Sequence, residues 1–128
     1  MIFRLNFAPL LGIAIACVLI VSCSAPADNL SYKTRLADHL SETGAMMYGA
    51  YWCPHCAEQK AMFDSAASQL PLTECDPNGE NAQPQLCIDK GVRGYPTWEI
   101  NGQLYPGVQS LFRLAELSAF EDSDAARP

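Results

Sequence analysis

The chain has 128 residues, which is about the size of one domain and small for two. Hydrophobic residues make up 49% of it and charged residues 17%, which is the composition of a globular protein and excludes a disordered one. The formal net charge is −6 at pH 7 and no run of Lys or Arg occurs, so nucleic acid is not an expected partner.

The N-terminal segment has the layout of a secretory signal. One cation, Arg4, precedes an almost unbroken apolar run from Phe7 to Val21, and small residues follow. The run has about 15 residues, which is short for a transmembrane helix of about 20 residues. We therefore predict a signal peptide over residues 1–22, a tether over residues 23–29, one domain over residues 30–120 and a loose tail over residues 121–128.

The end of this segment, Ile20–Ser24, reads IVSCS and resembles the lipobox of bacterial lipoproteins. The resemblance implies that Cys23 is lipidated, which would make the lipid bilayer a partner of the mature protein. Ordinary cleavage near Ala27 and an uncleaved anchor are the alternatives. All three place the domain outside the cytoplasm, in the periplasm or an equivalent space.

The rest of the sequence alternates between helical and strand-like patterns. In chain order we predict a helix over Leu30–Leu40, a strand over Ala45–Tyr51, a helix from Pro54 to about Leu70, a strand over Leu72–Cys75, a helix over Asn81–Lys90, a strand over Thr97–Ile100, a return strand over Gln103–Tyr105 and a helix over Leu111–Phe120. This order predicts an α/β fold with a small mixed sheet of about four strands and helices on both faces.

Turn and cap residues mark the ends of these elements. Pro54 and Pro84 suit the first turn of a helix, where the missing N–H costs nothing. Asn101 and Gly102 are a strong signal for a two-residue hairpin. The helix that begins at Pro54 is expected to bury an inner face made of Ala57, Ala61, Met62, Ala66 and Leu70.

The chain has six cysteines, of which Cys17 lies in the predicted signal and Cys23 in the lipobox-like segment. The other four form an even number in an exported domain, where disulfides persist. Cys53 and Cys56 have the spacing of a redox pair. If they pair with each other, the remaining two cysteines pair as well.

That second pair, Cys75 and Cys87, would close a loop of about a dozen residues and stabilise the domain by about 2–4 kcal/mol. The alternative role is a second redox pair that relays electrons to Cys53 and Cys56. A zinc site made of all four thiolates is a further alternative. Cys75 and Cys87 are too far apart in sequence to form the second half of such a site, so we expect no metal.

The sequence between Cys53 and Cys56, CPHC, begins a predicted helix. A sulfur at that position faces unpaired backbone N–H groups and the positive end of the helix dipole, and both favour the thiolate. His55, when protonated, would add a nearby cation and an N–H···S contact. We therefore expect Cys53 to be the nucleophile, His55 to stabilise its thiolate and Cys56 to be the resolving thiol. Because this stabilises the reduced pair, it favours donation of disulfides.

A strand, the sequence Trp52–Cys56 (WCPHC), a helix and then Gly94–Thr97 (GYPT) before another strand resemble the thioredoxin family. The resemblance implies that the peptide before Pro96 is cis and that this proline lies against the two cysteines. It also implies that the backbone of Tyr95 binds the client, meaning the protein whose thiols react. The residues expected to contact the client are Trp52, Pro54, Tyr95 and Pro96. The Pro-His dipeptide is that of the disulfide oxidant DsbA.

Three longer stretches resemble the thioredoxin-like domain of vitamin K epoxide reductase (VKOR) homologues: MYGAYWCPHC, ECDPNGENAQPQLC and GYPTWEINGQLYPG. The likeness implies that Cys75 and Cys87 form a structural disulfide. The membrane domain that reoxidises the redox pair in that group is not found here, so we expect a membrane redox partner in trans, of VKOR or DsbB type. Thioredoxin and DsbA have a buried acid where this chain has Met47, so the proton of Cys56 must use water or another group.

We therefore expect an extracytoplasmic thiol–disulfide oxidoreductase that needs no cofactor and introduces disulfides into exported proteins. A reductase or isomerase kept reduced by a membrane electron donor is the alternative direction. A protein that carries metal on the thiolates is an alternative from a different class.

Overall fold

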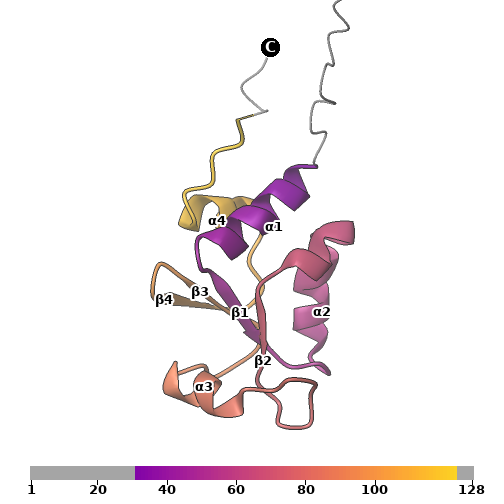
Figure 1. Cartoon of the computed structure of the whole chain (residues 1–128), viewed down its shortest axis with the longest axis vertical. Helices are drawn as coiled ribbons and strands as arrows, with labels where there is room; N and C mark the ends of the chain where they lie inside the picture. Colours follow the sequence, from indigo (N-terminus) through magenta and orange to yellow (C-terminus); the bar gives the residue numbers. More distant parts are fainter. Residues whose placement is uncertain (1–30, 124–128) are drawn as a thin grey trace, which may run out of the picture.

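The computed structural model describes residues 31–123. The predicted signal peptide, the tether with Cys23 and residues 124–128 lie outside the described residues. The elements are α1 (Tyr32–Glu42), β1 (Met46–Gly49), α2 (Pro54–Ala61), the 3₁₀ helix η1 (Asp64–Gln69), β2 (Leu72–Glu74), α3 (Pro84–Asp89), β3 (Thr97–Ile100), β4 (Gln103–Pro106) and α4 (Leu111–Leu117) (Figure 1). Within residues 31–123, no helix has the length and apolar character needed to cross a bilayer.

The four strands form one mixed sheet in the order β2-β1-β3-β4. β1 pairs in parallel with β2, with Tyr48 opposite Thr73, and α2 and η1 make the crossover between these strands. β1 also pairs antiparallel with β3, which continues through the Asn101–Gly102 turn into β4. The sheet confirms the predicted α/β architecture, a thioredoxin-like fold.

The two faces of the sheet carry separate apolar clusters because side chains alternate along each strand. Met47 and Trp98 belong to the larger cluster, into which α1, α2, η1 and α4 pack. Tyr48, next to Met47 in the chain, belongs to the smaller cluster with Cys75 and Cys87, on the side covered by α3. Figure 1 shows α3 apart from α1 and α4, at the opposite end of the view. Helices therefore cover both faces, as predicted.

The prediction of one continuous helix from Pro54 to Leu70 is wrong. α2 ends at Ala61, and η1 begins at Asp64, which has a positive φ of 49° that is incompatible with an α-helix. Just before this break, Phe63 is fully buried in the larger cluster. Asp64 itself forms an ion pair with Lys33 on α1. The break lets the chain turn and pack η1 along α1.

The predicted inner face of this helix is wrong in its first two turns. Ala57 and Ala61 are exposed. The buried positions of α2 are Cys56 and the polar Gln59, which are three residues apart and lie on one face of the helix. The prediction failed because alanine fits either face of a helix, whereas a glutamine is ordinarily assigned to the outer one.

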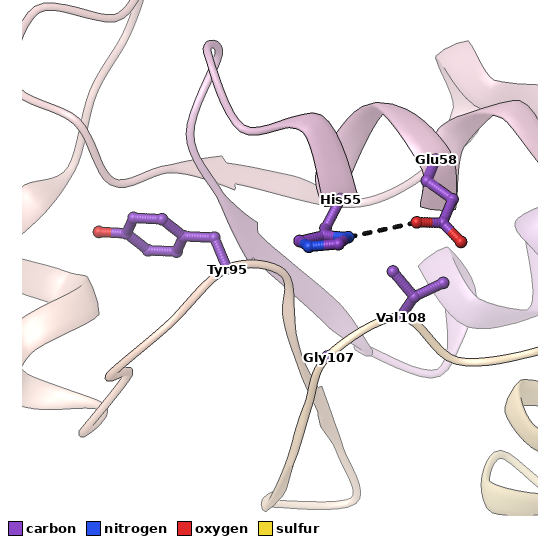
Figure 2. Close-up of a pocket in the computed structure, with 5 residues that line it drawn as sticks. All are labelled: His55, Glu58, Tyr95, Gly107 and Val108. Atoms are coloured by element: carbon purple, nitrogen blue, oxygen red, sulfur yellow. Dashed lines mark hydrogen bonds and ion pairs between the residues drawn. The ribbon is translucent and has the colours of Figure 1, made fainter.

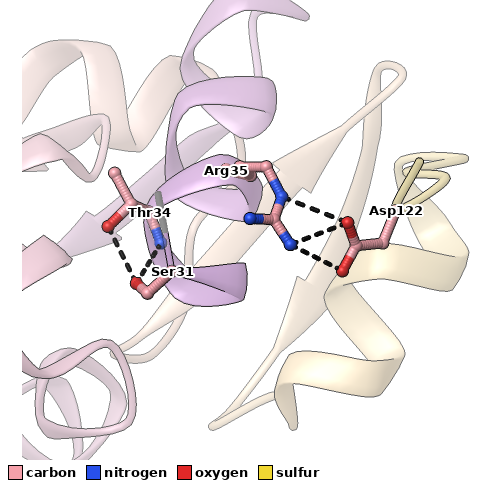
Figure 3. Close-up of polar contacts among 4 residues, drawn as sticks. All are labelled: Ser31, Thr34, Arg35 and Asp122. Carbon is pink, nitrogen blue, oxygen red and sulfur yellow. Dashed lines mark hydrogen bonds and ion pairs between the residues drawn. The ribbon is translucent and has the colours of Figure 1, made fainter. Parts of the chain in front are cut away.

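The two later helices are shorter than predicted. α3 begins at Pro84, because Asn81 has a positive φ of 51°, and α4 ends at Leu117, shortly before Ala119 with a φ of 53°. At the start of α1, the Ser31 hydroxyl accepts a hydrogen bond from the Thr34 N–H (Figure 3).

The first residues of the predicted tail are held against α1. Nη2 of Arg35 donates to both carboxylate oxygens of Asp122, each at 2.8 Å (Figure 3). Nε2 of His39, also on α1, lies 2.8 Å from the carbonyl oxygen of Ser118. Contacts with the first helix therefore reach Asp122, within the first residues of the predicted tail.

Candidate active site

Cys53 is the N-cap residue of α2, so its sulfur lies at the helix N-terminus, as the sequence predicted. Its Sγ accepts a hydrogen bond from the backbone N–H of Cys56 at 3.2 Å. The residue is 5% exposed. An N–H group directed at the sulfur, together with the positive end of the helix dipole, stabilises negative charge on a thiolate.

Cys56 lies one turn further into the helix and is buried against β1. A Cβ atom placed on Gly49 would be 2.9 Å from its Sγ, so β1 approaches the sulfur as closely as a strand can. Burial, and next the hydrogen bond with Cys53, raise the pKa of the Cys56 thiol to about 12. Cys56 is therefore protonated at neutral pH, and it must lose a proton before it can attack.

Met47 lies in the large cluster and is fully buried. A side chain on Gly49 would point at Cys56, and Met47, two residues earlier on β1, lies on the same face of the strand. The apolar methionine is therefore on the side of β1 where a buried acid could reach Cys56. Two influences lower the pKa of the Cys56 thiol, first the backbone of Ala50 and then the charge of Lys60, and together they only partly offset burial.

The segment before β3 crosses over Cys53. The Tyr95–Pro96 peptide is cis, and Sγ of Cys53 lies 3.6 Å from the carbonyl oxygen of Tyr95, to which the thiol donates. The ring of Pro96 is fully buried, so it supports this segment from beneath. The accessible surface beside Cys53 comes from Tyr95, which is half-buried, and not from the proline ring.

Trp52 stands next to the reactive cysteine and is 57% exposed. Its ring meets the Tyr95 ring edge to face, with 6.2 Å between the centroids. Its indole N–H donates to Oδ2 of Asp76 at 2.6 Å. The pKa of Asp76 is lowered, first by the backbone N–H of Asn78 and then by Trp52. This contact, which the sequence did not predict, connects the active-site tryptophan to the residue that follows Cys75.

A pocket of about 340 Å³ is lined by His55, Glu58, Tyr95, Gly107 and Val108 (Figure 2). It is placed beside the cysteines by two of these residues: His55 lies between them in the sequence, and the Tyr95 carbonyl accepts from the Cys53 thiol. Nδ1 of His55 lies 3.2 Å from Oε2 of Glu58, and the imidazole is 69% exposed. Figure 2 shows the Val108 side chain directed towards this pair and the Tyr95 ring directed away from it. The predicted contact of His55 with the sulfur is not among the hydrogen bonds of residues 31–123; the imidazole pairs with Glu58. Pro54, expected to contact the client, is exposed at the first position of α2.

Gln59 is a buried polar residue of α2 that the sequence analysis did not single out. Its Oε1 accepts hydrogen bonds from the Trp98 indole N–H at 3.1 Å and from the Gln109 backbone N–H at 2.7 Å. Its Nε2 donates to the Gln109 carbonyl oxygen at 3.0 Å. One side chain therefore connects the active-site helix, β3 and the segment before α4. The only signal for it was a glutamine three residues after Cys56, in line with it along the helix.

Cys75 and Cys87 form a disulfide that joins the end of β2 to α3, with their Cα atoms 5.8 Å apart. Both are buried, at 4% and 3% exposure, in the smaller cluster with Tyr48. The four-thiolate zinc arrangement does not form, because two of its sulfurs are bonded to each other in a cluster separate from Cys53 and Cys56.

No protein-family model matches the chain. It is 44% identical over 93 residues to the thiol-disulfide oxidoreductase LTO1 of Arabidopsis thaliana, which is 70% of this chain and 25% of the relative. It is 34% identical over 110 residues to a protein disulfide-isomerase of Aspergillus oryzae and 29% identical over 104 residues to one of Aspergillus niger, each match covering 74% of this chain and 20% of the relative. The chain thus spans a quarter or less of the length of these relatives. Their names support the predicted enzyme class, a thioredoxin-like thiol–disulfide oxidoreductase.

Proposed function

We propose that this protein is a thiol–disulfide oxidoreductase that acts through Cys53 and Cys56. The observation that carries the proposal is the position of Cys53: its sulfur caps α2, accepts the Cys56 N–H and lies under the carbonyl of Tyr95 beside an open pocket. A client chain laid along Tyr95 would bring its own sulfur to Cys53. The similarity to enzymes named for the same chemistry adds independent support.

In the oxidising direction, the enzyme begins with Cys53 and Cys56 joined in a disulfide. A client thiolate attacks Sγ of Cys53, the enzyme disulfide breaks, and Cys56 leaves and takes up a proton, as its raised pKa favours. A second client thiolate then attacks the client sulfur of the mixed disulfide and releases Cys53. The client loses two electrons and the enzyme gains them as a dithiol. Run backwards, the same steps reduce a client disulfide, with Cys53 attacking and Cys56 resolving.

Disulfide donation outside the cytoplasm is the direction we propose. The helix N-terminus beneath Cys53 favours the reduced enzyme, which makes its disulfide an oxidant. The signal-like segment and the IVSCS sequence support export and a lipid anchor on Cys23. The likeness of three sequence stretches to the VKOR-associated thioredoxin domain supports reoxidation by a membrane partner in trans, of VKOR or DsbB type.

A trapping experiment tests the chemistry. Replacing the resolving thiol, Cys56→Ala, should leave mixed disulfides between Cys53 and client proteins, visible as high-mass bands on non-reducing gels that reductant removes. The matched control is the double variant Cys53→Ala with Cys56→Ala, which should give none. If the single variant forms no adducts with exported thiol proteins, or forms them equally without Cys53, the proposal is wrong.

The direction has its own measurement. The redox state of Cys53 and Cys56 in cells, read by alkylation, should be mostly disulfide for an oxidant. A pair found mostly as thiols would leave the exchange chemistry intact but assign the protein to the reductase or isomerase alternative.

A further inference from the structure

Gln59 is fully buried, yet its carboxamide makes three hydrogen bonds to Trp98 and Gln109, far away in the chain, besides one from Nε2 to Sδ of Met62 at the end of its own helix. It has no contact with solvent, and its partner Trp98 belongs to the larger apolar cluster. A buried amide in such a place is costly unless it is fully paired, and its removal would leave several buried groups without partners. Its pairing with both the N–H and the carbonyl of Gln109 is a two-point clamp on one peptide segment.

The clamped segment forms one wall of the pocket beside Cys53. Gly107 and Val108, which line that pocket, directly precede Gln109. The segment is also held at its other end, because the Gly107 N–H donates to the Pro96 carbonyl oxygen at 2.7 Å. Gly107 has a positive φ of 87°, so the wall makes a sharp bend that glycine favours.

The opposite wall belongs to α2, through His55 and Glu58 (Figure 2). Glu58 immediately precedes Gln59, and Gln59 lies one turn after Cys56. The clamp therefore joins the two walls of the pocket at its base, from a residue of the same helix that carries the cysteines. The two hydrogen bonds between Gln59 and Gln109 thus link the element of one wall to the segment of the other.

We propose that Gln59 is a positioning residue for client binding: it fixes the Gly107–Gln109 segment against α2 and thereby holds the pocket beside Cys53 at the width that receives a client side chain. The proposal rests on the proposed function, since it takes this pocket to be where the client lies. The proposed role concerns client binding and not the exchange reaction itself, because Gln59 contacts neither the Cys53 sulfur nor the Cys56 sulfur among the described residues.

The test uses the full-length protein with the variant Gln59→Met, which keeps the length of the side chain and removes its polar groups. Turnover is followed with a fluorescent dithiol peptide as client and glutathione disulfide as oxidant. KM for the peptide should rise about fivefold or more. The rate at which reduced Cys53 reacts with a small aromatic disulfide should stay within about twofold of wild type, because that reagent does not need the pocket.

The matched control is Trp98→Phe, which removes another hydrogen bond to Gln59 and destabilises the same core without releasing Gln109. It should lower the melting temperature and leave KM near the wild-type value. An unchanged KM in Gln59→Met, or an equal rise in Trp98→Phe, would overturn the positioning role. If Gln59→Met does not fold, Gln59→Glu replaces it, measured against wild type at the same pH: KM should be near wild type at pH 5, where a protonated carboxyl can still donate to the Gln109 carbonyl, and should rise at pH 8, where the carboxylate has no proton to donate. A KM equal to wild type at both pH values would overturn the positioning role.

A second readout does not depend on activity. The Gln109 amide is bonded to Gln59, so its hydrogen exchange should accelerate at least about tenfold in Gln59→Met relative to amides of β1. Unchanged exchange would contradict the clamp even if the enzyme proved inactive on every peptide. Faster exchange in a protein without thiol exchange activity would instead reject the proposed function and keep the clamp.

Discussion

The two cysteine pairs of this domain lie in different apolar clusters, and their surroundings differ in three respects. Cys53 and Cys56 stand at the start of a helix, beside an open pocket, and under a backbone carbonyl that faces the reactive sulfur. Cys75 and Cys87 join the end of a short strand to a short helix and pack against Tyr48. Burial alone does not separate the pairs, since all four residues are buried.

What distinguishes the two pairs is the side from which a second protein chain could reach the sulfur. In the proposed function, a client chain approaches Cys53 along the backbone of Tyr95, whose carbonyl contacts the sulfur, whereas Cys87 packs in a cluster completed by Leu86 and Val92. One hydrogen bond joins the surroundings of the two pairs. Asp76, the residue after Cys75, accepts the indole N–H of Trp52, the residue before Cys53.

The largest expected effect distinguishes the two pairs directly. Cys53→Ser should abolish exchange with a dithiol peptide, because no nucleophile remains at the pocket, while the melting temperature of the reduced protein should change little. The double variant Cys75→Ala with Cys87→Ala should do the opposite and lose about 2–4 kcal/mol of stability. Its exchange rate, measured where it is folded, should stay within a few-fold of wild type. Loss of exchange in a folded double variant would make the second pair a participant in the reaction.

The next effect concerns pH and Cys56 alone. Because the pKa of this thiol is raised to about 12, its thiolate fraction increases about tenfold per pH unit between pH 6 and pH 9. The rate at which Cys56 releases a trapped client from Cys53 should rise with the same slope in stopped-flow measurements. A rate that is flat across this range would show that another group takes the proton and that the barrier lies elsewhere.

A smaller effect tests the contact between the two sites. Asp76→Asn keeps an oxygen for the Trp52 indole but removes the charge, whereas Asp76→Ala removes the contact. The alanine variant should raise KM for a peptide client by about two- to fivefold through loss of Trp52 orientation, and the asparagine variant by less. Tryptophan fluorescence, to which the exposed Trp52 and the buried Trp98 both contribute, should shift only in the alanine variant. Equal effects of both variants would point to the charge and not to the orientation.

The smallest expected effect concerns Glu99, on the face of the sheet where Cys75 and Cys87 lie. The pKa of Glu99 is lowered, first by Lys90 and then by the Tyr48 hydroxyl, both within 3 Å of its carboxylate. A depressed pKa stabilises the fold above the unfolded-state value near 4.5, and this contribution is lost as the pH falls through the folded-state value. Lys90→Gln should therefore destabilise the protein at pH 7 by about 1 kcal/mol or less and have no effect at pH 2–3. Exchange activity should not change.

Local sequence patterns were enough to predict the parts of the site that depend on neighbours in the chain. The CPHC spacing placed Cys53 at the start of α2 and Cys56 one turn inside it, and the even number of cysteines left for the domain predicted the pairing of Cys75 with Cys87. The Asn101–Gly102 hairpin and the order of elements followed from the same local signals.

The contacts between distant segments could not be predicted in this way. Nothing in a helical pattern distinguishes a glutamine that faces solvent from Gln59, whose partners lie 39 and 50 residues away. The break at Asp64 depends on how η1 packs along α1, and no proline or glycine at this position indicates it in the sequence. His55 pairs with Glu58 because the two side chains share an exposed face of α2, which a motif centred on the sulfur does not show.

The measurement that tests the central claim most directly is a redox titration in glutathione buffers with each cysteine quantified by alkylation and mass spectrometry. The account predicts that Cys53 and Cys56 pass together between disulfide and dithiol within the range of the buffer, while Cys75 and Cys87 stay bonded throughout. If Cys75 and Cys87 titrate in the same range, or Cys53 and Cys56 do not titrate at all, the division of the two pairs into one that reacts and one that holds the fold is contradicted.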